Sequence, residues 1–261
     1  MGRLGIIVLV FFCGFILIFG NIHWNRTIAK EAVTEEAVAG NQVKSKNGEN
    51  KKQYSPLQLA GNWSEQAQAT LKEKLEKDES FVISVVGTNV IDDDEFSIFE
   101  NVEDEVSKAF GSDVSLGKYI YEGTSIDFIN DETAAKVNSA NPDMIILEPA
   151  SLADNGVVRS EDAVENLAAI IETFKAHNPD VSVVLLDPLP LYEAVHYPRE
   201  VEELRKYATE NNIPYIHHWD KWQMDEGTEM EKYLQDDKRT PNEEGFAIWV
   251  DAVKDYLIKK S

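Results

Sequence analysis

Short apolar runs alternate with longer amphipathic stretches from residue 81 onward. Almost continuously apolar runs, which predict strands, cover 81–86, 116–121, 144–147, 181–186 and 215–217. Apolar residues recur at helical spacing in 95–110, 126–139, 161–177, 199–211 and 243–259. Strands that are apolar throughout are typical of a parallel sheet, because the connecting helices cover both of its faces. The pattern therefore predicts a three-layer α/β/α domain, with about five parallel strands, over residues 61–261.

The first residues of the chain follow a different pattern. Residues 4–19 are apolar and uncharged, and with the next few residues they approach the ~20 that a helix needs to cross a bilayer. Arg3 precedes the run, so the positive-inside tendency places the N-terminus in the cytoplasm. No small-residue cleavage site follows the run, which favours an uncleaved signal anchor, a transmembrane helix over residues 1–24, against a removed signal peptide.

A polar segment separates this anchor from the folded domain. Residues 25–60 carry mixed charges, and 40–53 have almost no apolar side chains, so this segment predicts a flexible stalk. Ser64 is then the expected N-cap of a first helix that runs to Lys77. The expected arrangement is a single-pass cell-membrane protein whose domain lies outside the cytoplasm.

The net charge of the chain limits the classes of partner that it can bind. Among 261 residues, 47 are acidic and 25 are basic, which gives a formal net charge of −22. A nucleic-acid partner is not expected, because nothing would offset repulsion from the phosphates. The single cysteine, Cys13, lies in the apolar N-terminal run, so neither an intrachain disulfide nor a cysteine-based zinc site can form.

Residues that favour loops and carry polar groups follow the expected strands in turn. In open α/β sheets, ligands bind at the carboxyl ends of the strands, so these are the positions where chemistry is expected. They include Gly87-Thr88-Asn89 after the first strand, Glu122 to Ser125 after the second, Glu148-Pro149 with Asp154 to Gly156 after the third, Asp187-Pro188 after the fourth and His217 to Asp220 after the fifth. A late segment, Asp237-Lys-Arg-Thr240, precedes the last helix.

In order and placement these segments resemble the motif blocks of the SGNH/GDSL hydrolases, over roughly Phe81 to the C-terminus. The segments 215–222 and 245–249 also resemble a bacterial, membrane-anchored branch of that family. The resemblance implies a flavodoxin-like fold and ester hydrolysis. By this resemblance, Asn89 stands at the nucleophile position and Gly123 at a backbone oxyanion position. Ala153 stands at the oxyanion asparagine position, and the final block places Asp237 as the triad aspartate and residue 240 as the base.

Three of these positions depart from the family pattern. The family has serine where Asn89 stands, histidine where Thr240 stands, and asparagine where Ala153 stands. A carboxamide is not an acyl-transfer nucleophile, and a threonine hydroxyl does not accept a proton near neutral pH as imidazole does. We therefore expect a catalytically impaired SGNH/GDSL hydrolase-like protein that binds a cell-envelope glycan or protein. The alternative is an active acyl or acetyl esterase of envelope carbohydrate with a non-standard nucleophile.

That alternative needs a substitute nucleophile and base, for which Thr88 and His196 are the candidates. His217, His218 and Asp220 also form a possible metal-binding group. However, adjacent residues on a strand face opposite sides, so packing at the strand end is the favoured interpretation of these histidines. No cofactor and no metal are expected.

Overall fold

The computed structural model describes residues 54–91, 97–222 and 224–260. The predicted anchor over residues 1–24 and the stalk up to residue 53 lie outside these residues. Within the described part, no helix is both long enough and apolar enough to cross a membrane.

The centre of the domain is a five-stranded parallel sheet in the order β2-β1-β3-β4-β5. Its strands are β1 (Phe81–Thr88), β2 (Val114–Tyr121), β3 (Met144–Leu147), β4 (Ser182–Leu186) and β5 (Tyr215–Ile216). The predicted parallel sheet of about five strands is thus confirmed. The connection after β1 runs to β2 on one side, whereas the connection after β3 runs to β4 on the other side. The topological switch point therefore lies between β1 and β3.

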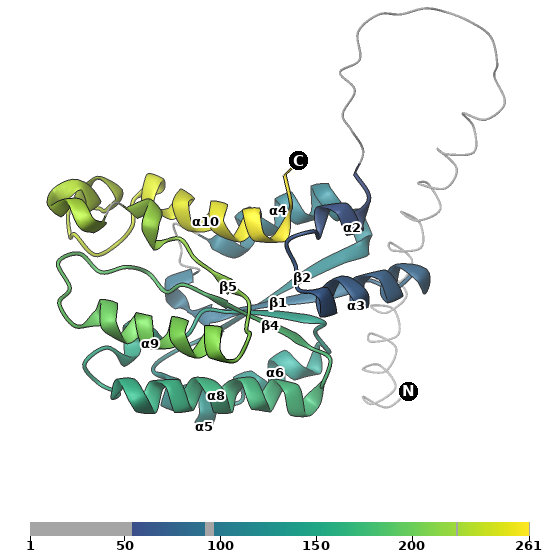
Figure 1. Cartoon of the computed structure of the whole chain (residues 1–261), viewed down its shortest axis with the longest axis horizontal. Coiled ribbons are helices and arrows are strands. Elements are labelled where there is room, and N and C mark those ends of the chain that lie inside the picture. Colours follow the sequence, from purple (N-terminus) through teal and green to yellow (C-terminus); the bar gives the residue numbers. More distant parts are fainter. Residues whose placement is uncertain (1–53, 92–96, 223, 261) are drawn as a thin grey trace, which may run out of the picture. The chain divides into compact units, whose positions relative to one another are not determined.

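Helices cover both faces of the sheet, as the sequence predicts (Figure 1). One face carries α2 (Pro56–Leu59), α3 (Glu65–Glu76), α4 (Ile98–Phe110) and α10 (Glu243–Leu257). The other carries α5 (Ser125–Asn130), α6 (Thr133–Ser139), α8 (Ser160–His177) and α9 (Tyr197–Glu210). Short elements complete the loops: α7 (Ser151–Asp154), η1 (Asn89–Ile91), η2 (Gly111–Asp113), η3 (Trp219–Trp222) and η4 (Met224–Tyr233).

Alternation along the strands divides the core into two apolar clusters. Ile83 and Val85 of β1 pack under α4 and α10, whereas Val86 packs on the opposite side. Likewise, Ile146 of β3 faces the first cluster and Ile145 the second. Each strand is buried on both faces, which explains why its sequence is apolar without interruption.

Two helices differ from the sequence-based expectation. The stretch 126–139, expected as one helix, forms α5 and α6, because the Asp131 carboxylate accepts both the backbone N–H and the hydroxyl of Thr133 at 2.7 and 2.8 Å. That local bonding offers the backbone an alternative to a continuous helix. In addition, the last residues of the expected stalk form α2, where Ser55 and Gln58 make a reciprocal capping box and Pro56 stands in the first turn.

The N-terminal helices close the domain at the amino edge of the sheet. The Trp63 indole donates to the backbone oxygen of Leu257 at 2.9 Å and stacks at a tilt on Phe81, the first residue of β1. The Ser64 hydroxyl lies 3.0 Å from that of Ser182, the first residue of β4. The carboxyl edge, where the site residues lie, is therefore left uncovered by these helices.

Candidate active site

Strand register gathers the first three motif positions at the carboxyl edge. Thr88, the last residue of β1, pairs with Tyr121, the last residue of β2, and Val86 pairs with Leu147, the last residue of β3. Asn89 follows Thr88 in η1 and is exposed to solvent. The loops after β1, β2 and β3 therefore begin side by side at the switch point, where an α/β sheet of this order binds ligands.

Thr88 does not face solvent but bonds a buried carboxyl group. Its N–H and its hydroxyl both donate to Oε2 of Glu148, each at 3.1 Å, and both residues are almost fully buried. Gly87 makes room for this group, since a Cβ there would lie 3.0 Å from Cβ of Glu148 and 2.7 Å from Cδ1 of Ile91. Burial raises the pKa of Glu148 to about 7, although the two hydrogen bonds from Thr88 oppose the shift.

Gly123 lies in a tight turn between β2 and α5. Its φ of +93° belongs to the left-handed region that glycine adopts without steric cost. A side chain at this position would overlap the Asp127 carboxylate, which accepts hydrogen bonds from the N–H and the hydroxyl of Thr124 at 2.7 Å each. The glycine at the oxyanion position is thus required by the geometry of the turn.

The third motif position supplies no hydrogen-bond donor side chain. Ala153 lies in α7, and its methyl group packs against the apolar cluster beneath α8. The neighbouring Asp154 is buried and accepts the backbone N–H of Ser125 at 2.8 Å. The Ser125 hydroxyl in turn accepts a hydrogen bond from the Asn166 amide at 2.9 Å. These contacts tie the loop after β2 to the loop after β3.

The last motif block forms a closed turn on the carboxylate of Asp237. The Thr240 hydroxyl donates to Oδ2 at 2.6 Å, and the N–H groups of Thr240 and Arg239 donate to Oδ1 at 2.9 and 2.8 Å. These bonds, that of the Thr240 hydroxyl above all, lower the pKa of Asp237. The carboxylate that would orient a histidine base instead accepts the hydroxyl that stands in the place of that base.

His217 and His218 make their hydrogen bonds to residues other than the motif positions described above. His196 is exposed and directly precedes α9. His218 is fully buried: its Nδ1 accepts the Trp222 indole N–H at 2.9 Å, and burial lowers its pKa to about 4, so the ring is neutral at pH 7. His217 is half-exposed, with Nδ1 2.6 Å from Oδ2 of Asp187.

Asp187, which the sequence placed at the carboxyl end of β4, accepts hydrogen bonds from several neighbouring residues. The side chain is completely buried, and it accepts two hydrogen bonds from the Arg205 guanidinium, each at 3.0 Å. It also accepts the backbone N–H of His218 at 3.0 Å and lies against the His217 ring. Among the described residues, no group of three or more His, Cys, Asp or Glu is arranged to hold a metal ion.

The structure thus gives defined contacts to two acids, Glu148 and Asp187, which the sequence placed at strand ends without assigning them a role. Each directly follows an apolar run, and an acid in that place is the only signal that the sequence offered. Asn89, Gly123 and Ala153 are brought to one edge, as the motif order predicts. The Asp237 carboxylate bonds only Arg239 and Thr240 among the described residues, within the turn that precedes α10.

Comparison with known proteins places the fold. No protein-family model and no curated protein matches the sequence. Solved structures do match. A lipase/acylhydrolase from Enterococcus faecalis has a TM-score of 0.57 at 14% identity, covering 69% of this chain and 98% of that one. A GDSL-like lipase from Bacteroides thetaiotaomicron matches with a TM-score of 0.52 at 18% identity, and the match covers 74% of this chain and 98% of that one. A carbohydrate esterase family 3 protein from Talaromyces cellulolyticus matches with a TM-score of 0.53 at 13% identity, and the match covers 68% of this chain and 96% of that one.

Proposed function

We propose that this chain, which has the fold of the SGNH/GDSL hydrolases, acts by binding rather than by acyl transfer. In this proposal residues 1–24 anchor it in a bacterial cell membrane, and the domain lies on the outer side, where it recognises an envelope glycan or protein. The observation that carries the proposal is the turn in which the Thr240 hydroxyl occupies the Asp237 carboxylate. No imidazole is held there, and Asn89 offers no nucleophile.

The size of the expected impairment follows from the parts that are missing. Loss of one member of a serine-hydrolase triad lowers the rate by about 10⁴-fold or more, and loss of further members adds little. Residual catalysis of about 10³-fold over water comes from the oxyanion donors and substrate binding. Here the side chain at the oxyanion asparagine position is the methyl group of Ala153, so even this residual catalysis should be reduced.

Ester hydrolysis and covalent labelling test this proposal directly. The full chain, purified in detergent, is expected to hydrolyse p-nitrophenyl acetate no faster than its Asn89→Ala variant and to resist a fluorophosphonate probe. A serine esterase of the same fold serves as the positive control in the same detergent. Rapid hydrolysis with stoichiometric labelling of the wild-type chain would overturn the proposal. A weak gain of labelling in Asn89→Ser/Thr240→His would support the assignment of the two positions.

One observation favours the alternative, an acyl or acetyl esterase of envelope carbohydrate. The Thr88 hydroxyl donates to a carboxyl group whose pKa is about 7, so this group is substantially ionised at neutral pH and can accept a proton. One solved structure of this fold is named a carbohydrate esterase. If the chain releases acetate from acetylated xylan or peptidoglycan fragments, the alternative requires that the Thr88→Val variant release none. The His196→Ala variant tests the candidate base, and Ser107→Ala, an exposed position on α4, is the control.

A further inference from the structure

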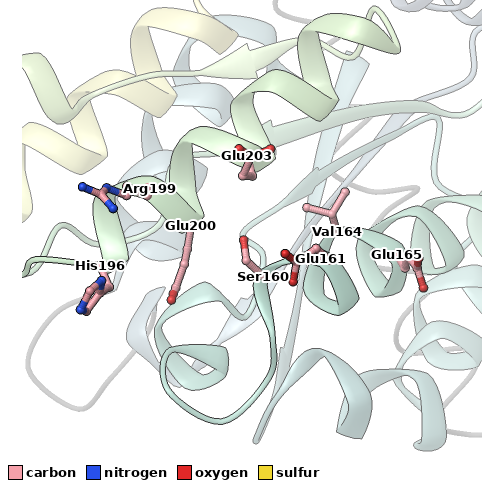
Figure 2. A pocket seen from close by; sticks show the side chains of 8 residues that line it. All are labelled: Ser160, Glu161, Val164, Glu165, His196, Arg199, Glu200 and Glu203. Carbon is pink, nitrogen blue, oxygen red and sulfur yellow. The ribbon is translucent and has the colours of Figure 1, made fainter.

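A groove opens between the first turns of α8 and α9, on the face of the sheet opposite α10 (Figure 2). Its volume is about 620 Å³, within the range of about 300–1,000 Å³ typical of ligand sites. It is lined by Ser160, Glu161, Val164, Glu165, His196, Arg199, Glu200 and Glu203. Because both helices start at the carboxyl edge, the groove opens near the ends of the strands that carry the motif positions.

Exposed apolar side chains flank this groove. Large apolar residues exposed among the described part of the chain are Ile126, Ile129, Val157 and Val195. Val195, 73% exposed, directly precedes His196, and Val157, 74% exposed, lies three residues before Ser160. Single exposed apolar residues are common on protein surfaces. These two adjoin lining residues in the chain, so a partner segment seated in the groove would pass near both.

The charge of the lining defines what such a partner carries. Glu161, Glu165 and Glu200 make no ion pair with any described residue, and Glu203 has only an exposed contact of 3.9 Å with Lys206. Arg199 and the imidazole of His196 are the basic groups of the lining, against four glutamates. Glu161 and Glu200 lie in first turns, where they also offset the positive ends of the helix dipoles. An anion would therefore meet carboxylates rather than free N–H groups.

Figure 2 shows Glu161 of α8 and Glu200 of α9 on the two sides of the opening. An ammonium or guanidinium group between them would face carboxylates from both helices, and its apolar neighbours would cover Val157 and Val195. We propose that the groove docks a segment of a partner protein in which lysine or arginine alternates with apolar side chains. This inference rests on the proposed function, because it takes the domain to act by binding, and it names the class of partner.

Peptide titration of the full chain in detergent tests the proposal. The probe is an acetylated, amidated peptide of alternating leucine and lysine, with a serine–lysine peptide of equal charge and spermidine as comparisons. We expect the leucine–lysine peptide to bind at least fivefold more tightly than either comparison, and more weakly as salt is raised. The variant Glu161→Gln/Glu165→Gln/Glu200→Gln should weaken that binding at least fivefold, and Val157→Ser/Val195→Ser should weaken it as well.

The control removes the same charge from the opposite face. Glu100→Gln/Glu103→Gln/Asp104→Asn alters exposed acids of α4 and is expected to change the affinity less than twofold. Equal losses in the two charge variants would show binding by net charge alone and overturn the proposal. Equal affinity for the serine–lysine peptide or for spermidine would also overturn it, as would absence of binding at millimolar peptide. Ester hydrolysis is measured separately, so either proposal can fail while the other stands.

Discussion

At the scale of single residues, Glu148 illustrates how burial competes with hydrogen bonding. Its Oε2 atom accepts two hydrogen bonds from Thr88, which favour the ionised form. The side chain is nevertheless almost fully removed from water, and the cost of desolvating a charge outweighs those bonds, so the pKa rises from 4.5 to about 7. A carboxyl group at the switch point therefore changes charge close to neutral pH.

Replacement of Glu148 by glutamine should change how stability depends on pH. The folded state binds the proton of Glu148 more tightly than the unfolded state, so wild-type stability falls as pH rises from about 4.5 to 7. The loss is on the order of 3 kcal/mol. Glutamine keeps an acceptor for Thr88 without this charge, so Glu148→Gln should be the more stable protein at pH 8 and nearly equal at pH 4.5. Urea unfolding across this pH range measures both.

The matched control for that measurement is Glu103→Gln, an exposed acid on α4, which should keep the wild-type pH dependence. Parallel pH profiles for wild type and Glu148→Gln would contradict the buried, proton-binding state of Glu148.

The sequence located most of the motif positions but not the contacts of their side chains. An acid after an apolar run, such as Glu148, has the same local sequence whether it turns into the domain or out to solvent. In the folded domain Gly87 leaves room for the Glu148 side chain and Thr88 bonds it, and both contacts cross from β1. Similarly, the resemblance assigned Asp237 and Thr240 to the last motif block, but the hydrogen bonds that close their turn depend on its backbone conformation.

At the scale of elements, Asp187 joins the end of β4 to β5 and to α9. Arg205 reaches it from α9 with two hydrogen bonds, and the indole ring of Trp219 lies 4.7 Å from the guanidinium on its other side. The backbone N–H of His218 fixes the chain after β5 to the same carboxylate. Because β5 has only two residues, this polar contact supplements a short ladder.

Removal of the Asp187 carboxylate should be strongly destabilising. Asp187→Ala leaves the partly buried Arg205 with only the exposed Glu202 as a partner, and breaking a buried ion pair in this way costs about 3–5 kcal/mol. Asp187→Asn retains an acceptor and should cost less. Asp220→Ala removes an exposed acid 3.8 Å from His217 and should change stability by less than about 0.5 kcal/mol. Denaturant unfolding of the three variants checks this order, and similar stability of Asp187→Ala and Asp220→Ala would contradict it.

Periodicity predicted which elements exist, and local side-chain bonding set where they end. The five strands and the long helices α8 and α10 follow from apolar spacing, since each must bury one face or both. The break between α5 and α6 does not, because it depends on how the Asp131 carboxylate bonds the next turn. Boundaries of this kind arise from single hydrogen bonds that leave the apolar pattern unchanged.

At the scale of the whole molecule, the proposed anchor predicts where the domain is accessible. The run 4–19 and the preceding Arg3 favour a cytoplasmic N-terminus with the domain outside. Protease added to intact protoplasts is therefore expected to degrade the domain while a cytoplasmic marker protein survives. Immunoblotting with an antibody against α10 follows the loss. Survival of the domain, or its release into the medium as a shorter soluble protein, would contradict an uncleaved anchor.

The two ends of the described domain lie together at the amino edge of the sheet. The chain enters the described domain at Tyr54, and Leu59 accepts a hydrogen bond from the N–H of Lys259 at 2.7 Å, beside the Trp63–Leu257 contact. Both ends of the domain therefore sit at one pole, and the motif positions and the groove sit at the other. A molecule that binds at the carboxyl pole can therefore do so without displacing the chain at either end of the described domain.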